Sequence, residues 1–355
     1  MEVYAQHPYY QVVAVKPKTI STRALASKLF IEERTLCFVT GYYLKPFVTQ
    51  DIKLIDCTMG GENAHRGFLE TSIPTAVFLD TSSDLTNKAS DLPNAYPTKD
   101  QVLSAIKKLG LNLTDRIVLY GQPHMDMSMT RAYHILHAYG FTDVTVLDGG
   151  LLKFTQDGYP TCPGIDYTGP ASQVEDLADP SPYLIQMDEI IEFAEGKKPN
   201  MQLIDARGEQ SFNGNDPNLP PGTRQGHVPG AINIPADTFI NSDDDTFLKY
   251  PEIVEILESK GIDKSKDIVV MCKTGVTATI NYLALTMAGY TGVRLYDGSW
   301  TEYGAGDGPI AETTPKMPFY YQPVMMPTPQ YYIVPSGQQY MAIQEDKGHL
   351  PVYHK

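Results

Sequence analysis

Residues 268–278 read IVVMCKTGVTA and place one cysteine, Cys272, at the point that decides the fold. The apolar residues 268–271 predict a short buried strand, and the apolar-periodic stretch 280–288 predicts a helix. Cys272 therefore lies at a strand-to-helix turn, where free backbone N–H groups and the positive end of the helix dipole favour a thiolate. The dipole supplies up to ~2 kcal/mol to a thiol whose pKa starts near ~8.5. Taken alone, this stretch favours the plainer interpretation, a buried cysteine at a strand end.

Three further blocks of sequence surround this stretch and change that interpretation. They read LIDAR at 203–207, GHVPGAINIP at 226–235 and LYDGSWTEY at 295–303. In this order and spacing around Cys272, they resemble the rhodanese family, and most closely its two-domain sulfurtransferases of the thiosulfate and mercaptopyruvate type. The resemblance is specific over residues 183–304 and weaker over 21–160. It implies that Cys272 takes sulfane sulfur from a donor, becomes a persulfide and passes the sulfur to an acceptor.

The chain repeats itself with a period of about 150 residues, which is too long for a solenoid and indicates domain duplication. Gly121 of the first copy matches Cys272 of the second, so the first domain lacks the thiol. Each copy alternates short apolar strands with amphipathic helices, such as 99–109 and 253–260. We therefore expect an α/β fold of two tandem rhodanese-like domains, each a parallel sheet with helices on both faces.

The changes in composition along the chain predict five segments. These are an N-terminal extension (1–20), a non-catalytic domain (21–160), a proline-rich linker (161–182), a catalytic-type domain (183–310) and an extended Pro/Tyr-rich C-terminal tail (311–355). Prolines exclude a long helix in the tail, while its Tyr and Met side chains favour burial. The tail is expected either to wrap its own two domains or to bind a protein partner.

Composition excludes several classes of protein. A net charge of −14 argues against nucleic-acid binding, and no apolar run reaches the roughly 18 residues of a membrane helix. The other cysteines, Cys37, Cys57 and Cys162, form neither a disulfide framework nor a zinc pattern, and we expect them to be inert. No spacing implies a metal or an organic cofactor. The stretch 3–31 is basic and has no acidic residue, which favours a mitochondrial location, with a cytoplasmic one as the alternative.

The loop after Cys272 is the candidate sulfur-binding site. Rhodanese-type folds also include phosphatases with a C-x5-R loop, but Ala278 stands where that arginine would bind phosphate. The expected cradle for one sulfur atom comprises Lys273, Thr274, Gly275, Val276 and Thr277. Lys273 is either a cation that lowers the thiol pKa or an ordinary solvated lysine.

The residues that bind the anionic donor in the family depart from its pattern here. Ser211 stands where the family has an arginine, Pro220 where mercaptopyruvate enzymes have another, and Ser72 where the first domain carries a histidine. Arg224 is the candidate replacement for the missing charge. Arg207 is a further candidate for donor binding, although pairing within its own domain is the favoured interpretation.

The expected function is transfer of sulfane sulfur from a small donor anion to a thiol or cyanide-like acceptor through a Cys272 persulfide. The alternative is a catalytically weak accessory subunit of a larger complex, since the anion-binding arginines are missing. Lys273 would then be the main positive charge beside the sulfur, and Ser211→Arg should partly restore binding of dianions.

Overall fold

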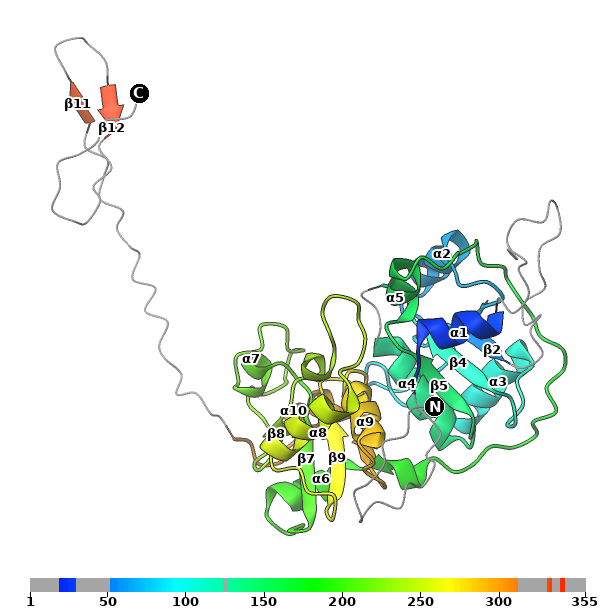
Figure 1. The fold of residues 1–355 in the computed structure, drawn as a ribbon. Coiled ribbons are helices and arrows are strands. Elements are labelled where there is room, and N and C mark those ends of the chain that lie inside the picture. Colours follow the sequence, from blue (N-terminus) through cyan, green and yellow to red (C-terminus); the bar gives the residue numbers. More distant parts are fainter. Residues whose placement is uncertain (1–18, 30–51, 124–126, 312–330, 334–338, 342–355) are drawn as a thin grey trace, which may run out of the picture. The chain divides into compact units, whose positions relative to one another are not determined.

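The computed structural model describes residues 19–29, 52–123, 127–311, 331–333 and 339–341, which contain two α/β domains (Figure 1). The described residues of the first domain form a parallel sheet of five strands in the order β1-β5-β4-β2-β3. Its strands are β1 (Thr19–Ile20), β2 (Lys53–Asp56), β3 (Val77–Phe78), β4 (Ile117–Tyr120) and β5 (Val144–Leu147).

The second domain repeats this sheet. Its described strands follow the equivalent order β6-β10-β9-β7-β8, again with every pair parallel. They are β6 (Leu184–Ile185), β7 (Met201–Asp205), β8 (Ile232–Asn233), β9 (Asp267–Met271) and β10 (Arg294–Tyr296). The expected duplication, with a parallel sheet in each copy, is confirmed.

Successive residues of a strand point to opposite faces of a sheet, and in the first domain both faces are covered by helices. Ile55 and Leu119 pack with α3 and α4 on one face, whereas Leu54 and Tyr120 pack with α1, α2 and α5 on the other. The helices are α1 (Thr22–Leu29), α2 (Glu62–Glu70), α3 (Lys99–Leu109), α4 (Met127–Ala138) and α5 (Gly150–Gln156).

The second domain has the same two layers of helices. Ile204 and Val270 face α8 and α9, while Leu203 and Met271 face α6 and α10. The helices are α6 (Met187–Ala194), α7 (Glu209–Phe212), α8 (Tyr250–Ser259), α9 (Ala278–Met287) and α10 (Ser299–Ala305), with short 3-10 turns η1 (Ser181–Tyr183) and η2 (Ala236–Phe239). The predicted helices 280–288 and 253–260 correspond to α9 and α8, each with its start placed earlier by the structure.

Helices α4 and α9 join the two domains. Both contribute to one continuous apolar cluster, and the hydroxyls of Thr130 and Thr279 lie 2.8 Å apart across the contact. Thr130 and Thr279 also occupy equivalent positions of the two copies, counted from the matching ends of their helices. The domains therefore meet across a pseudo-twofold relation of the duplicated fold.

The segments between and outside the domains are only partly described. Within the linker, Val174 and Leu177 are buried against the first domain, and Cys162 pairs with Ser72 in an isolated bridge. Most of the N-terminal extension and of the C-terminal tail lies outside the described residues, as does Cys37. In the tail, β11 (Tyr331–Ile333) and β12 (Gln339–Met341) form an antiparallel hairpin.

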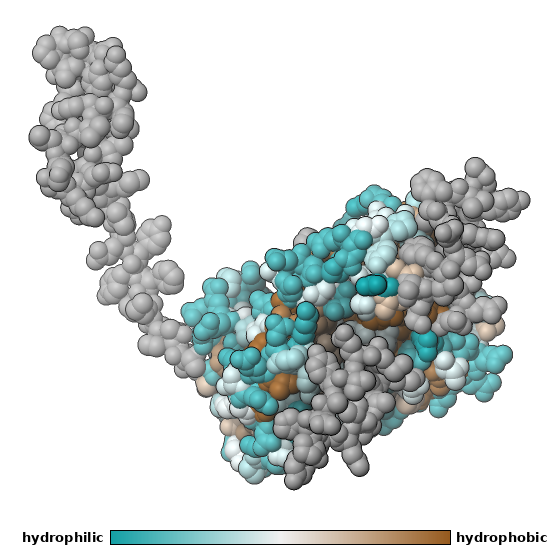
Figure 2. All heavy atoms as spheres, in the orientation of Figure 1, coloured by the Kyte–Doolittle hydropathy of each residue, from teal (hydrophilic) through white to brown (hydrophobic). Residues whose placement is uncertain are grey.

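The surface of the described part is largely hydrophilic on the face shown in Figure 2, with hydrophobic atoms in scattered patches. Among the described residues, Tyr250 is an exposed large hydrophobic side chain, at 55%. Among the described residues, no helix has both the length and the apolar character needed to cross a membrane.

Candidate functional site

Cys272 lies directly after strand β9 and ahead of helix α9, where the sequence placed it. The residue is 1% exposed. Its backbone N–H donates to the Ser299 hydroxyl at 3.1 Å, and its carbonyl accepts from the Trp300 N–H at 3.0 Å. The thiol is thus held at the carboxyl edge of the sheet by the start of helix α10.

The loop after Cys272 turns carbonyl oxygens toward protein donors. The Lys273 carbonyl accepts from the Thr301 N–H and hydroxyl at 3.0 and 2.7 Å, and the Gly275 carbonyl accepts from Arg131 at 3.1 Å. Among the described residues, the backbone N–H groups of 273–277 have no acceptor in hydrogen-bond geometry. They are therefore available for a sulfur atom or an oxyanion beside Cys272.

Gly275 has a structural reason to be glycine. Its φ is +73°, in the left-handed region, and a Cβ there would lie 2.5 Å from the Asp297 carbonyl oxygen. A larger residue would push the loop away from the corner at Asp297. The loop geometry therefore depends on this one position.

Lys273 is not a free cation beside the sulfur. Its ammonium lies 3.3 Å from the Asp216 carboxylate and donates to the Asn218 carbonyl at 2.6 Å. Asp216 is 6% exposed and also accepts from the Asn218 N–H at 2.9 Å. Burial alone would raise the pKa of Asp216, but these hydrogen bonds outweigh it and hold that pKa below its usual range. The structure therefore places the Lys273 ammonium in an ion pair with Asp216.

Arg207 is placed inside its own domain, as the favoured interpretation anticipated. Its guanidinium binds the buried Asp205 carboxylate through Nε and Nη2, the latter at 2.7 Å, and stacks 4.2 Å over the Trp300 ring. Nη2 also donates to the Gly226 carbonyl at 2.9 Å. This side chain positions the domain core and presents no charge to a donor.

Arg224 is also occupied. Its guanidinium donates to the carbonyls of Gly304, Gly308, Tyr303 and Gly306, the last through a short contact. These oxygens lie at the end of helix α10 and beyond it, away from the loop that carries Cys272. The described partners of the Arg224 side chain are thus backbone carbonyls, and its role as a replacement for the missing arginines stays a prediction.

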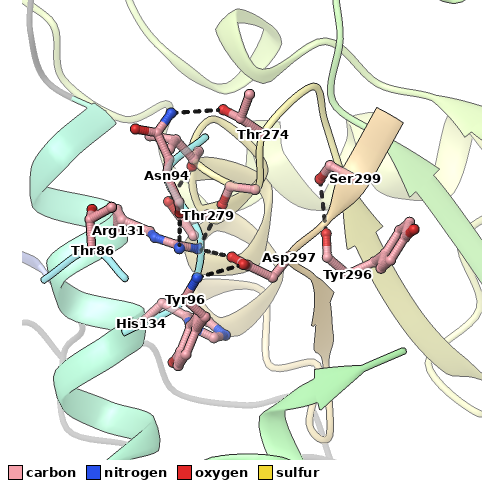
Figure 3. A network of polar contacts seen from close by, with 12 residues as sticks. Thr86, Asn94, Tyr96, Arg131, His134, Thr274, Thr279, Tyr296, Asp297 and Ser299 are labelled. Atoms are coloured by element: carbon pink, nitrogen blue, oxygen red, sulfur yellow. Dashed lines mark hydrogen bonds and ion pairs between the residues drawn. The ribbon is translucent and has the colours of Figure 1, made fainter. Parts of the chain in front are cut away.

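The first domain contributes residues that sequence analysis missed (Figure 3). Arg131 of helix α4 is 1% exposed and binds Asp297 at 2.7 Å in addition to the Gly275 carbonyl. Asn94 donates to the Thr274 hydroxyl at 3.2 Å and accepts from Arg131 through its carbonyl at 2.9 Å. The Cys272 loop is therefore held from outside by the other domain.

Little in the sequence pointed to these contacts. Arg131 is one basic residue in a helix, and Asn94 lies in a loop without any catalytic motif. Asp297 lies in the stretch 295–303 of the family pattern, and its partners Arg131 and Tyr96 belong to the other copy. Arg131 and Asn94 become neighbours of the Cys272 loop because the two domains pack against each other.

The remaining described cysteines lie away from this loop. Cys57 is fully buried, its Sγ lies 3.2 Å from the Tyr120 carbonyl, and burial raises the pKa of its thiol well above the ordinary value. Cys162 is a free cysteine in the linker. The part of the chain that the structure describes holds no group of three or more His, Cys, Asp or Glu side chains suited to a metal ion.

Comparison with known proteins identifies this architecture. The family model of the rhodanese-like domain matches residues 41–157 and 189–305. The 3-mercaptopyruvate sulfurtransferase of Mus musculus is 32% identical over 267 residues, covering 73% of this chain and 86% of that protein. The mitochondrial thiosulfate/3-mercaptopyruvate sulfurtransferase 1 of Arabidopsis thaliana is 29% identical over 276 residues, covering 71% of this chain and 72% of that protein.

A solved structure supports the same assignment. The crystal structure of SseA from Escherichia coli, described as a 3-mercaptopyruvate sulfotransferase, superimposes with a TM-score of 0.65 and 25% sequence identity. The match covers 80% of this chain and 98% of that structure. Both rhodanese-like domains of the chain are thus accounted for in sequence and in fold.

Proposed function

The chain belongs to the rhodanese family, and we propose that it is a sulfurtransferase that moves sulfane sulfur through a persulfide on Cys272. The observation that carries this proposal is the cysteine at the strand-to-helix turn, followed by backbone N–H groups that no described residue uses. Such donors and the N-terminus of helix α9 stabilise a thiolate and a persulfide anion. The relatives do not favour the alternative of a purely accessory subunit.

The chemistry takes two displacement steps. The Cys272 thiolate attacks the outer sulfur of the donor, an Sγ–S bond forms, and the bond between that sulfur and the rest of the donor breaks with its electron pair on the leaving group. The acceptor, a thiolate or cyanide, then attacks the outer sulfur of the persulfide and regenerates the Cys272 thiolate. The substrates we propose are a small sulfur-donor anion and a thiol or cyanide-like acceptor.

Mass spectrometry of the intact protein tests this assignment. After incubation with thiosulfate or mercaptopyruvate and removal of the donor, Cys272 should gain the mass of one sulfur atom and lose it on addition of cyanide. Cys272→Ser should show no gain and no thiocyanate formation, because serine forms no persulfide. The matched control is Cys57→Ser, since that thiol is buried and lies outside the loop. Full thiocyanate turnover by Cys272→Ser would refute the proposal.

We further propose a mitochondrial location. It is supported by the basic, acid-free stretch 3–31 and by the mitochondrial name of the Arabidopsis relative. A fusion of residues 1–31 to a fluorescent protein should accumulate in mitochondria, and a cytoplasmic signal would contradict it. A protein partner bound by the C-terminal tail stays a prediction, because most of the tail lies outside the described residues.

A further inference from the structure

A buried carboxylate contacts the residue that follows Cys272. The side chain of Asp216 is 5% exposed, and its carboxylate faces the ammonium of Lys273 at 3.3 Å. Ser211 lies close enough to lower the pKa of this carboxylate. A negative charge therefore stands beside the first residue of the loop that follows Cys272.

The distance from this carboxylate to the sulfur is short enough to matter. Lys273 follows Cys272 directly, and consecutive Cα atoms are about 3.8 Å apart. The lysine side chain adds about 6 Å, its contact with Asp216 3.3 Å and the cysteine side chain about 3 Å, so Asp216 lies within roughly 16 Å of the thiol, at most about two Debye lengths at ordinary ionic strength. Partial burial weakens the screening further.

Lys273 is the cation that pairs with Asp216, and the described arginines discussed above have other partners. Arg131 is paired with Asp297, and Arg207 is paired with Asp205. Arg224 is held by four backbone carbonyls at the end of helix α10. Beside Cys272, the ion pair of Lys273 and Asp216 therefore has no net charge.

We propose that Asp216 is a specificity-determining residue: by neutralising Lys273, it makes the Cys272 site favour sulfane-sulfur donors of low negative charge over dianions such as thiosulfate. This inference rests on the proposed function and adds the charge class of the donor. Asp216 does not touch the reacting atoms; it acts through Lys273 and through its own field. The discrimination should therefore follow the charge of the donor rather than its size.

Two donors of nearly the same shape separate charge from shape. Methanethiosulfonate is thiosulfate with one oxygen replaced by a methyl group, so it carries one negative charge instead of two. With either donor, the Cys272 thiolate bonds to the outer sulfur. The electron pair of the broken S–S bond leaves with sulfite or with methanesulfinate. Both reactions give the same enzyme persulfide without an oxidant or a reductant.

The test compares kcat/KM for the two donors, with cyanide as acceptor and thiocyanate as product. Removing one charge at about 12 Å, inside the bound above, in a medium of effective dielectric constant ~40 predicts gains for Asp216→Asn of about tenfold for thiosulfate and about threefold for methanethiosulfonate. Both gains should shrink when ionic strength rises from about 0.05 M to 0.5 M. Adding Lys273→Gln to Asp216→Asn should remove them, because the charge that is released belongs to Lys273.

Two controls keep the result specific to this carboxylate. Asp263→Asn removes an equal charge from an exposed turn after helix α8 and should change each kcat/KM less than twofold. Asp216→Glu preserves the charge, so it should leave the ratio of the two kcat/KM values unchanged. If Asp216→Asn left kcat/KM unchanged, or changed it by the same factor for both donors, the proposal would be overturned, because a purely structural effect does not depend on the charge of the donor. If neither donor forms a persulfide on Cys272 in any variant, the proposed function itself fails.

Asp216 also changes what a restored arginine should do. An arginine at position 211 would lie beside Asp216 and pair with it, since Ser211 is close enough to lower the pKa of that carboxylate. We therefore expect Ser211→Arg alone to raise kcat/KM for thiosulfate less than the double variant Ser211→Arg/Asp216→Asn does. A larger gain for the single variant would contradict the role assigned to Asp216.

Discussion

The two copies of the fold satisfy the same buried aspartate in different ways. In the first domain, Asp56 accepts from the Thr58 hydroxyl at 2.6 Å and from the Gln122 side chain at 2.7 Å. The Gln122 backbone N–H in turn donates to the Thr58 hydroxyl at 2.8 Å. In the described part of the loop after strand β4, Gln122 is thus bound to the aspartate, and Gly121 stands where the second domain has its thiol.

In the second domain, the equivalent Asp205 is satisfied by Arg207 instead. The guanidinium occupies both carboxylate oxygens, so the loop after strand β9 is not needed as a donor to Asp205. That loop keeps Cys272 and its unused N–H groups. The two copies therefore differ in the residue that binds this aspartate, Thr58 in the first domain and Arg207 in the second. In the first domain the loop residue Gln122 also binds the aspartate, and in the second domain Arg207 takes that place.

The copies differ again where each reaches across to the other. Asp297 accepts from the Tyr96 N–H at 2.7 Å, and its counterpart Asp148 accepts from the Phe247 N–H at 2.8 Å. Only Asp297 also has an arginine, because Ile280 stands in helix α9 where Arg131 stands in α4. The first domain has therefore lost its thiol and supports the loop that has one.

The largest expected effect comes from breaking the buried pair of the second domain. Arg207→Met should lower the free energy of unfolding by about 3–5 kcal/mol, because it leaves Asp205 buried without its counterion. The matched change in the first copy, Thr58→Val, removes a neutral donor from Asp56 and should lower it by about 1–3 kcal/mol. Urea unfolding followed by the fluorescence of Trp300, the only tryptophan of the chain, reports on the second domain.

The double variant Asp205→Asn/Arg207→Met is the control for this pair. It removes both charges together and should recover part of the stability lost by Arg207→Met. If Arg207→Met were no more destabilising than Thr58→Val, the pair would not distinguish the two copies as the structure indicates.

A second variant tests whether the first domain supports the sulfur loop. Arg131→Met should lower the free energy of unfolding by about 2–3 kcal/mol, less than Arg207→Met, because Asp297 is 17% exposed and gains water. It should also lower kcat more than it raises KM. The Gly275 carbonyl loses its hydrogen-bond donor, while no group that binds the sulfur-donor substrate is removed. Stopped-flow persulfide formation and urea unfolding measure the two effects.

Arg131→Lys and Arg116→Met complete that comparison. Lysine keeps the charge beside Asp297 but not the forked contact to the Gly275 and Asn94 carbonyls, so it should recover stability better than kcat. Arg116 forms an exposed pair with Asp143 at 3.5 Å, and its removal should change stability by less than about 1 kcal/mol. An unaltered kcat in Arg131→Met would show that the first domain does not hold the loop in its working geometry.

The sequence was sufficient for the fold because the fold rests on local patterns. The apolar run at 268–271, the loop and the helix after it appear in β9 and α9 almost as predicted, and the repeat predicted equivalent sheets. The candidate cysteine followed from the same pattern. The charges around it did not, because Lys273 meets Asp216 across 57 positions of chain and Arg131 meets Asp297 from another domain. A list of missing arginines could not show that the remaining cations are already paired.

The smallest expected effect is a pH dependence of stability that comes from Asp148, the counterpart of Asp297 that has no arginine partner. Burial raises the pKa of Asp148 to about 6, with Asp244 adding to the shift while the Phe247 N–H and Lys153 oppose it. Between pH ~4 and ~6 the folded state keeps a proton that the unfolded state, with a pKa of ~3.9, has lost. This contribution to stability is present below the unfolded pKa and is lost as pH rises through about 6.

Asp148→Asn keeps an oxygen for the Phe247 N–H and removes the titration. The variant should match the wild type near pH 4 and exceed it by about 1–2 kcal/mol at pH 7, after allowance for solvent screening. Asp297→Asn should do the opposite at pH 7, because it leaves the buried Arg131 without its counterion. Urea unfolding of both variants at pH 4, 5, 6 and 7 measures these differences. Parallel curves for Asp148→Asn and the wild type would show that the two cross-domain aspartates are equivalent, and that Ile280 in place of an arginine has no electrostatic consequence.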